Sequence, residues 1–282
     1  MSGRIAYVNG RFAPIGEAVV SVEDRGYQFA DGVYEVWLAR DGRLLDMDAH
    51  LARLSRSLRE LEISAPMSET SLRAVLSETL RRNKAKDAIV YLQVTRGVAP
   101  RNHPFPKPAV APSIVITVKR VDARALWAQG EKGVKVISAP DLRWKRCDIK
   151  TVALLSNVLA KQQAAEQGAQ EAWLIDERGD VTEGSSSTAW IVDASGVLRT
   201  RALSNEILPG VVRARVLELA RALQIKVEES SFTLQQAKEA REALLTSATN
   251  GPVGIVDIDG TAIGDGAPGA ITKRLRDAYF GA

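Results

Sequence analysis

Short apolar runs open the chain and predict β-strands joined by tight turns. Asn9-Gly10 and Asp41-Gly42 are dipeptides typical of hairpin turns, and an apolar run flanks each of them on both sides. Leucines recur at helical spacing in two segments and predict two helices. The first helix is expected to begin at Asp48, as its N-cap, and the second to span Glu69–Arg82. The strands expected in this half are Ile5–Val8, Arg11–Pro14, Val19–Val22, Val33–Ala39, Arg43–Met47, Ile89–Val94 and Ile114–Val118.

Strands and helices follow one another through the second half of the chain. The expected strands are Val134–Ile137, Ala172–Ile175, Val181–Glu183, Thr188–Val192, Val197–Thr200, Ile225–Val227, Ala243–Thr246 and Gly254–Ile258. Helices are expected after Lys150 to about Gln167, from Pro209-Gly210 to about Leu223, near Leu234–Ala243 and from about Ala270. The pattern predicts an α+β protein with an N-terminal α/β domain (1–120), a linker with a short helix (121–132) and a C-terminal domain (133–282).

Composition and charge exclude several classes of function. The chain has 282 residues and a net charge of +4 from scattered lysines and arginines, which gives little support to nucleic-acid binding. Cys147 is the only cysteine and His50 and His103 are the only histidines, so neither an intramolecular disulfide nor a metal site is expected. No apolar signal core and no run of membrane-spanning length occurs, which favours a cytoplasmic protein without membrane contact.

Lys150 stands at the start of an apolar pattern that has helical spacing. Val152, Leu154, Leu155, Val158 and Leu159 form the pattern and predict one buried helix face. Shielding from water lowers the pKa of an amine, so a lysine at the edge of such a face is suited to nucleophilic or Schiff-base chemistry. The alternative is a lysine that extends its amine into solvent.

Other segments offer groups that suit an anionic cofactor. Glu183 precedes Gly184 and three serines, a turn whose N–H and hydroxyl groups suit a phosphate. Leu208–Val212 opens a helix whose free N–H groups favour the same ligand, and Leu245–Asn250 is a further loop rich in hydroxyls. Arg53 adds a guanidinium. Each segment alone is compatible with an ordinary turn, but an amine, a carboxylate and several phosphate donors together suit pyridoxal phosphate.

Five motifs resemble those of the class IV aminotransferases, which have fold type IV, and are most similar to the D-amino acid enzymes. They are DRGYQFADGVYEV, QVTRGVAPRNHPFP, RWKRCDIK, VTEGSSS and ILPGVVR, and they occur in the family's order over nearly the whole chain. The resemblance implies a pyridoxal phosphate enzyme with a smaller N-terminal α/β domain and a larger, β-barrel-like C-terminal domain with flanking helices. It also implies a homodimer in which a loop of one subunit reaches the site of the other.

The same resemblance assigns roles at the cofactor. Lys150 would form the Schiff base and move the α-proton, and Glu183 would pair with the pyridine nitrogen. Ala248 stands where the D-amino acid enzymes usually have threonine, so Thr249 is a possible substitute. The remaining cofactor-binding residues implied are Arg53, Ser185, Ser186, Leu208, Val211, Val212 and Ser247.

Substrate binding is implied for Tyr34, Arg101 and His103, which would hold the α-carboxylate. The reaction implied is ping-pong transamination of a D-amino acid, such as D-alanine or D-glutamate, with 2-oxoglutarate or pyruvate. A branched-chain L-amino acid aminotransferase and an (R)-amine transaminase are the nearest alternatives on this scaffold. An aminodeoxychorismate lyase and a non-catalytic pyridoxal phosphate carrier are the others. The Arg101 and His103 pair argues against the three enzymes, which have other residues at these positions, and a carrier would need no site for the carboxylate.

Overall fold

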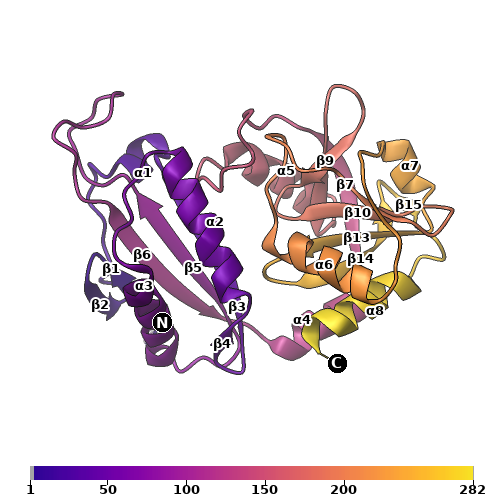
Figure 1. Cartoon of the computed structure of the whole chain (residues 1–282), viewed down its shortest axis with the longest axis horizontal. Coiled ribbons are helices and arrows are strands. Elements are labelled where there is room, and N and C mark those ends of the chain that lie inside the picture. The colour runs from indigo at the N-terminus through magenta and orange to yellow at the C-terminus, as the bar shows by residue number, and fades with distance from the viewer. Residues whose placement is uncertain (1–2, 282) are drawn as a thin grey trace. The chain divides into compact units, whose positions relative to one another are not determined.

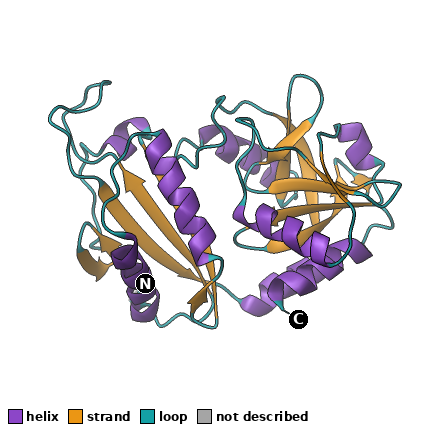
Figure 2. Cartoon of the chain, in the orientation of Figure 1, coloured by secondary structure: helices purple, strands orange, loops and turns teal. Residues whose placement is uncertain are grey.

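A computed structural model describes residues 3–281, which form two compact units (Figures 1 and 2). The first unit contains the chain up to Asp122 together with Ile149–Ala153. The second contains Ala123–Asp148 and the chain from Leu154 onward. The segment expected as a linker includes helix α4 (Ala123–Lys132), which belongs to the second unit.

The first unit is an antiparallel sheet with two long helices packed on it. Strand order is β2-β1-β6-β5-β3-β4. The strands are β1 (Ile5–Val8), β2 (Arg11–Pro14), β3 (Gly32–Arg40), β4 (Arg43–Leu44), β5 (Ala88–Thr95) and β6 (Ser113–Arg120). The helices are α1 (Arg25–Phe29), α2 (Met47–Glu60) and α3 (Glu69–Arg82).

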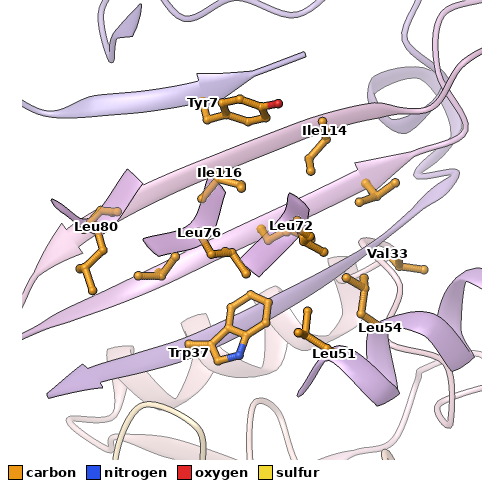
Figure 3. Close-up of a cluster of buried hydrophobic side chains, with 14 of the residues drawn as sticks. Tyr7, Val33, Trp37, Leu51, Leu54, Leu72, Leu76, Leu80, Ile114 and Ile116 are labelled. Carbon is orange, nitrogen blue, oxygen red and sulfur yellow. The ribbon is translucent and has the colours of Figure 1, made fainter. Parts of the chain in front are cut away.

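One face of this sheet carries the core of the unit. Alternate residues of β3, among them Val33 and Trp37, point to the side on which α2 and α3 lie, and Figure 3 shows leucines of both helices filling that side. Trp37 and Leu76 are fully buried there. Because side chains alternate along a strand, Tyr34 of β3 points to the opposite face. The sheet therefore separates a helix-covered core from a second face that bears Tyr34.

Segment Ile149–Ala153 completes the edge of β3. Tyr34 N donates to Lys150 O at 3.0 Å, and Val152 N donates to Gly32 O at 3.1 Å. The expectation of a helix directly after Lys150 is therefore wrong, because these residues are extended and their backbone groups pair with β3. The helix begins only at Leu155.

A buried carboxylate joins β3 to α2. Glu35 is fully buried on the helix side, where it accepts hydrogen bonds from Arg53 Nε at 2.7 Å and Arg53 Nη2 at 2.9 Å. His50 Nδ1 lies 2.7 Å from the second carboxylate oxygen. Burial raises the pKa of Glu35, but the charge and hydrogen bonds of Arg53, with the hydrogen bond of His50, outweigh it and bring that pKa to about 2. Burial lowers the pKa of His50, which the Glu35 contact offsets only in part.

The second unit is built on a curled, mixed sheet. Strand order is β12-β11-β10-β13-β14-β7-β8-β9, with β15 paired to β14. The strands are β7 (Val134–Pro140), β8 (Glu171–Ile175), β9 (Val181–Gly184), β10 (Thr188–Val192), β11 (Leu198–Thr200), β12 (Val227–Glu229), β13 (Glu242–Ser247), β14 (Gly251–Ile258) and β15 (Thr261–Ala262). Besides α4, its helices are α5 (Leu155–Glu166), α6 (Val211–Ala222), α7 (Leu234–Lys238) and α8 (Ala270–Phe280).

Helix α5 packs on β7 and β8 through small residues. Ala160 and Ala164 are its buried side chains, whereas Leu155, Val158 and Leu159 are 72%, 57% and 62% exposed. The expected buried face of large apolar residues is therefore wrong for this chain. Alanines let the helix approach the sheet closely, which turns the larger residues outward.

The α+β class and most expected elements are confirmed. Helix α3 and strand β10 have the expected bounds, and the other long elements differ by a few residues. Val19–Val22 is not a strand, because it forms no strand pairing with any part of residues 3–281, and its Val19 and Val22 side chains are 78% and 77% exposed. Among residues 3–281, no helix combines the length and apolar character needed to cross a membrane.

We predict an acid-sensitive contribution of Glu35 to stability. A carboxylate with a pKa of about 2 when folded and about 4.5 when unfolded stabilises the folded state fully above pH 4.5, and this stabilisation is lost as the pH falls to 2. The shift corresponds to about 3 kcal/mol in the free energy of unfolding. Chemical unfolding from pH 7 to pH 2 should therefore show a shallower loss of stability for Glu35→Gln than for the wild type. Glu69→Gln, which alters an exposed glutamate of the same unit, should follow the wild-type curve, and parallel curves for Glu35→Gln would contradict the prediction.

Candidate active site

Lys150 is held by its backbone while its side chain lies over an aromatic ring. Besides the pairing with β3, Lys150 N donates to Ser57 Oγ of α2 at 3.3 Å. Its Nζ atom lies 4.1 Å from the centroid of the Tyr34 ring, a distance suited to a cation–π contact. The Tyr34 ring stacks on Tyr91 with centroids 5.7 Å apart. Burial raises the pKa of Tyr91 to about 12, with a smaller contribution from Tyr34, so that phenol stays protonated.

Arg101 and His103 gather around Phe29 of α1. The Arg101 guanidinium carbon lies 4.4 Å from the Phe29 ring centroid, and the ring centroids of His103 and Phe29 are 5.3 Å apart. Within residues 3–281, no hydrogen bond, ion pair or ring contact joins Arg101 or His103 to Tyr34 or Lys150. The structure thus brings two of the three expected carboxylate-binding residues together and places Tyr34 with Lys150.

A buried arginine that the sequence interpretation missed shapes the loop of Arg101 and His103. Arg25 is 3% exposed, and its guanidinium donates to Asn102 O at 2.5 Å and His103 O at 3.1 Å. Asp31 accepts from Arg25 at 2.8 Å and from Arg96 at 2.7 Å and 3.0 Å. The loop is therefore anchored through its backbone, which leaves the Arg101 and His103 side chains at its surface.

Glu183, at the end of β9, belongs to a cluster of charged side chains in the second unit. Arg143 donates to its Oε1 atom, and Leu208 N lies 3.2 Å from each carboxylate oxygen. Arg143 also makes a two-point ion pair with Asp141, at 2.9 Å and 2.7 Å. Burial lowers the pKa of Arg143, but the hydrogen bonds to Asp141 and the charges of Glu183 and Asp141 outweigh it, so the pKa is raised. Neither Asp141 nor Arg143 stood among the expected site residues.

The serine turn after Glu183 directs its hydroxyl groups to another carboxylate. Glu171 is 2% exposed and accepts hydrogen bonds from Ser185 Oγ, from Ser186 Oγ at 2.8 Å and from Ser187 Oγ at 2.9 Å. Lys161 Nζ lies 3.2 Å from the same carboxylate. Since a hydroxyl has one proton, the Ser185 and Ser186 hydroxyls donate to Glu171 in this arrangement. Ser185 N donates to Ala172 O at 2.8 Å, so of these groups only the Ser186 N–H is left to consider as a donor to an anion. Glu171 opens a strand, and nothing in its sequence window indicates this role.

Helix α6 begins next to Leu208, as the Pro-Gly pair indicates. Gly210 is its N-cap, and a side chain there would meet Thr188 Oγ1 at 2.9 Å. The N–H groups of Val211 and Val212 belong to the first turn, where the helix offers donors and the positive end of its dipole. This part of the chain therefore has the donors that an anion needs.

The turn between β13 and β14 brings two hydroxyl groups together. Ser247 Oγ and Thr249 Oγ1 are 3.2 Å apart, and Ala248 lies between them in the chain. Thr249 thus places its hydroxyl beside that of Ser247, where Ala248 can offer only its N–H group.

The sequence matches the family described as amino-transferase class IV over residues 32–258. Among curated proteins, it is 40% identical over 270 residues to D-alanine aminotransferase of Bacillus licheniformis, covering 96% of this chain and 94% of that protein. It is 38% identical over 274 residues to D-alanine aminotransferase of Staphylococcus haemolyticus, covering 97% and 95%.

Solved structures of branched-chain amino acid aminotransferases have a similar fold. The enzyme from Thermoproteus uzoniensis with norvaline aligns with a TM-score of 0.85 at 25% identity, over 99% of this chain and 94% of that one. A bacterial enzyme of this kind, from Escherichia coli, aligns with a TM-score of 0.90 at 23% identity, over the same shares of the two chains. Together with the sequence match, they confirm the expected fold type IV. The chain belongs to the class IV aminotransferases.

Proposed function

We propose that the protein transfers the amino group of a D-amino acid, of the D-alanine or D-glutamate type, to a 2-oxo acid such as 2-oxoglutarate or pyruvate in a ping-pong reaction. The observation that carries the proposal is the 38% and 40% identity, over nearly the whole chain, to relatives named D-alanine aminotransferase. The similar branched-chain enzymes reach only 23% and 25% identity. Sequence similarity therefore favours a D-amino acid over a branched-chain L-amino acid as the substrate.

The donor groups of this chain fit pyridoxal phosphate. That cofactor supplies an aldehyde for the amino group and a ring that takes up the electrons of the broken Cα–H bond. Lys150 offers an amine whose backbone is fixed by pairing with β3. Glu183 offers a carboxylate with 8% of its side chain exposed, which suits a cationic ring nitrogen. We assign Lys150 to the aldehyde and Glu183 to the ring nitrogen.

The phosphate would be held by groups from several elements. Arg53 has an orientation fixed by Glu35, and the first turn of α6 offers the N–H groups of Val211 and Val212. Further donors are Ser247, the Ala248 N–H group, Thr249 and the N–H group of Ser186, whereas Ser185, whose N–H donates to Ala172 O, would contribute only by shaping this turn. The Leu208 side chain would lie against the ring, since its backbone N–H is already directed to Glu183.

Lys150 would also act as the acid and base of the reaction. Its Nζ atom would take the α-proton of the substrate and then donate a proton to the carbon of the cofactor that receives the amino group, as a positioned amine can. The nearby Tyr34 ring limits the positions that this amine occupies. Tyr34, Arg101 and His103 would bind the substrate α-carboxylate, because a guanidinium, an imidazole and a phenol supply several donors to two oxygens.

We further propose a cytoplasmic homodimer in which the loop of Arg101 and His103 serves a second copy. The exposed residues Leu155, Val158 and Leu159 have helical spacing and give α5 an apolar face that suits such a subunit contact. Arg25 anchors the loop by its backbone carbonyls, which keeps its side chains available to a neighbour.

Comparison of amino donors tests the proposed substrate class. With pyruvate or 2-oxoglutarate as the acceptor, D-alanine and D-glutamate should react at least about tenfold faster than L-leucine. An L-amino acid cannot place its carboxylate on the carboxylate-binding residues and also direct its Cα–H bond toward Lys150. An (R)-amine without a carboxylate should also be a poor donor. Faster reaction of L-leucine would assign the protein to the branched-chain group, and a preferred (R)-amine would assign it to the amine transaminases.

Lys150→Ala should abolish transamination of D-alanine while the protein stays folded. Loss of a positioned acid–base group lowers the rate by about 10²-fold or more. Steady-state rates measure the effect, and circular dichroism checks the fold. The matched control is Lys145→Ala, an exposed lysine of the same chain segment, which should keep the wild-type rate. Wild-type turnover in Lys150→Ala would refute the assignment.

Arg101→Ala should raise the KM for D-alanine by about tenfold or more, since hydrogen bonds to a charged group are worth about 1.5–3 kcal/mol. Arg101→Lys should recover part of the loss because it restores the charge without the two-point geometry. Arg59→Ala, in which an exposed arginine of α2 is removed, serves as the control for the change in charge. An unchanged KM in Arg101→Ala would mean that this loop does not bind the substrate.

A further inference from the structure

Three charged side chains with little exposure meet at the end of β9. The exposed fractions of the Asp141, Arg143 and Glu183 side chains are 12%, 6% and 8%. Arg143 lies between the two carboxylates, with a two-point ion pair to Asp141 and a hydrogen bond to Glu183. Thr182 Oγ1 donates to Asp141 at 2.7 Å, so Asp141 is itself held in place.

The charges of this set determine what Glu183 presents to a ligand. If only Arg143 accompanied Glu183, the guanidinium would cancel the carboxylate charge, and a cation would gain little by binding. If Glu183 were alone, its burial would favour the protonated, neutral acid. With both neighbours charged, the three groups carry one net negative charge, and Glu183 still has an ionic partner.

The protonation states agree with that count. Burial raises the pKa of Asp141, but the hydrogen bonds and charge of Arg143 outweigh it and lower the pKa, so Asp141 is ionised at neutral pH. The pKa of Arg143 is raised, so it is protonated. The Cys147 thiol is also near, and burial raises its pKa to about 11, so it adds no charge.

We propose that Asp141 and Arg143 are positioning residues that hold Glu183 ionised and leave one net negative charge to stabilise the protonated ring nitrogen of pyridoxal phosphate. This inference rests on the proposed pairing of Glu183 with that nitrogen. Arg143 orients the carboxylate, and Asp141 neutralises Arg143 so that the charge of Glu183 is not cancelled. If Asp141 and Arg143 only stabilised the fold, their ion pair would be needed, but the affinity for a cationic ring would not depend on the net charge of the three groups.

The affinity of the apoenzyme for two cofactors measures this charge preference directly. One is pyridoxal 5′-phosphate, and the other is its 1-deaza analogue, in which C–H replaces the ring nitrogen. The quantity of interest is the ratio of the two dissociation constants, obtained by absorbance titration without any turnover. The wild type should prefer pyridoxal phosphate by about tenfold or more, the worth of a charge-assisted hydrogen bond.

Asp141→Asn keeps the shape of the side chain and removes its charge, so the three groups become neutral overall. The preference should fall by at least about threefold, because the uncompensated Arg143 opposes a cationic ring. Asp141→Glu keeps both the negative charge and the ionic partner of Arg143, so it should retain the preference. Asp193→Asn, in a turn after β10 where the carboxylate accepts from Ser195 Oγ at 2.7 Å, makes the same charge change and should leave the ratio unaltered.

Each outcome has a defined meaning. A wild-type ratio near one would refute the pairing of Glu183 with the ring nitrogen, and with it that part of the proposed function. A strong wild-type preference that persists in Asp141→Asn, or that Asp141→Glu loses, would overturn the charge role alone. If Asp141→Asn does not fold, Asp141→Glu and Arg143→Lys, which both keep the three charges, must retain the preference, and its loss in either would overturn the inference.

Discussion

The need to compensate buried carboxylates determines how the functional parts of this protein are held. The buried Glu35, Glu171 and Glu183 and the partly buried Asp31 lie in four different places, and each accepts from donors of other segments of the chain. A buried charge that loses its partner is strongly destabilising, so each cluster fixes the segments that supply its donors. The clusters thereby join α2 to β3, anchor the loop of Arg101, and order the residues on both sides of Glu183.

Much of the fold follows from apolar periodicity, and the failures have physical causes. Leucine spacing located α3 to the residue, and the Asn-Gly and Asp-Gly turns located both hairpins. Val19–Val22 has strand-like composition but no partner strand in the described part of the chain, and a strand needs one to satisfy its backbone groups. After Lys150 the helical pattern corresponds to a helix only from Leu155 onward, because the backbone groups of the preceding residues pair with the free edge of β3.

Some residues of the candidate site could be predicted from the sequence, whereas others depend on contacts between distant segments. Motifs and their order pointed to Lys150 and Glu183, because the chemistry of a single side chain is visible in a short window. The neighbours Glu35, Glu171 and Arg143 were missed, since a buried ion pair depends on which distant segments the fold brings together. His50 illustrates the limit, since it lies in α2 and contacts Glu35 of β3, a pairing that no short sequence window contains.

The place of Ile149–Ala153 beside β3 has a consequence for the order in which the protein is made. The other strands of the first unit are complete once the ribosome has passed Asp122, yet the edge of β3 stays open until Ala153 has emerged. An open strand edge is a site of mispairing in a nascent chain. Lys150, which we propose to supply the reactive amine, is thus also carried by the segment that closes this edge, so the N-terminal unit is finished only when Lys150 is in position.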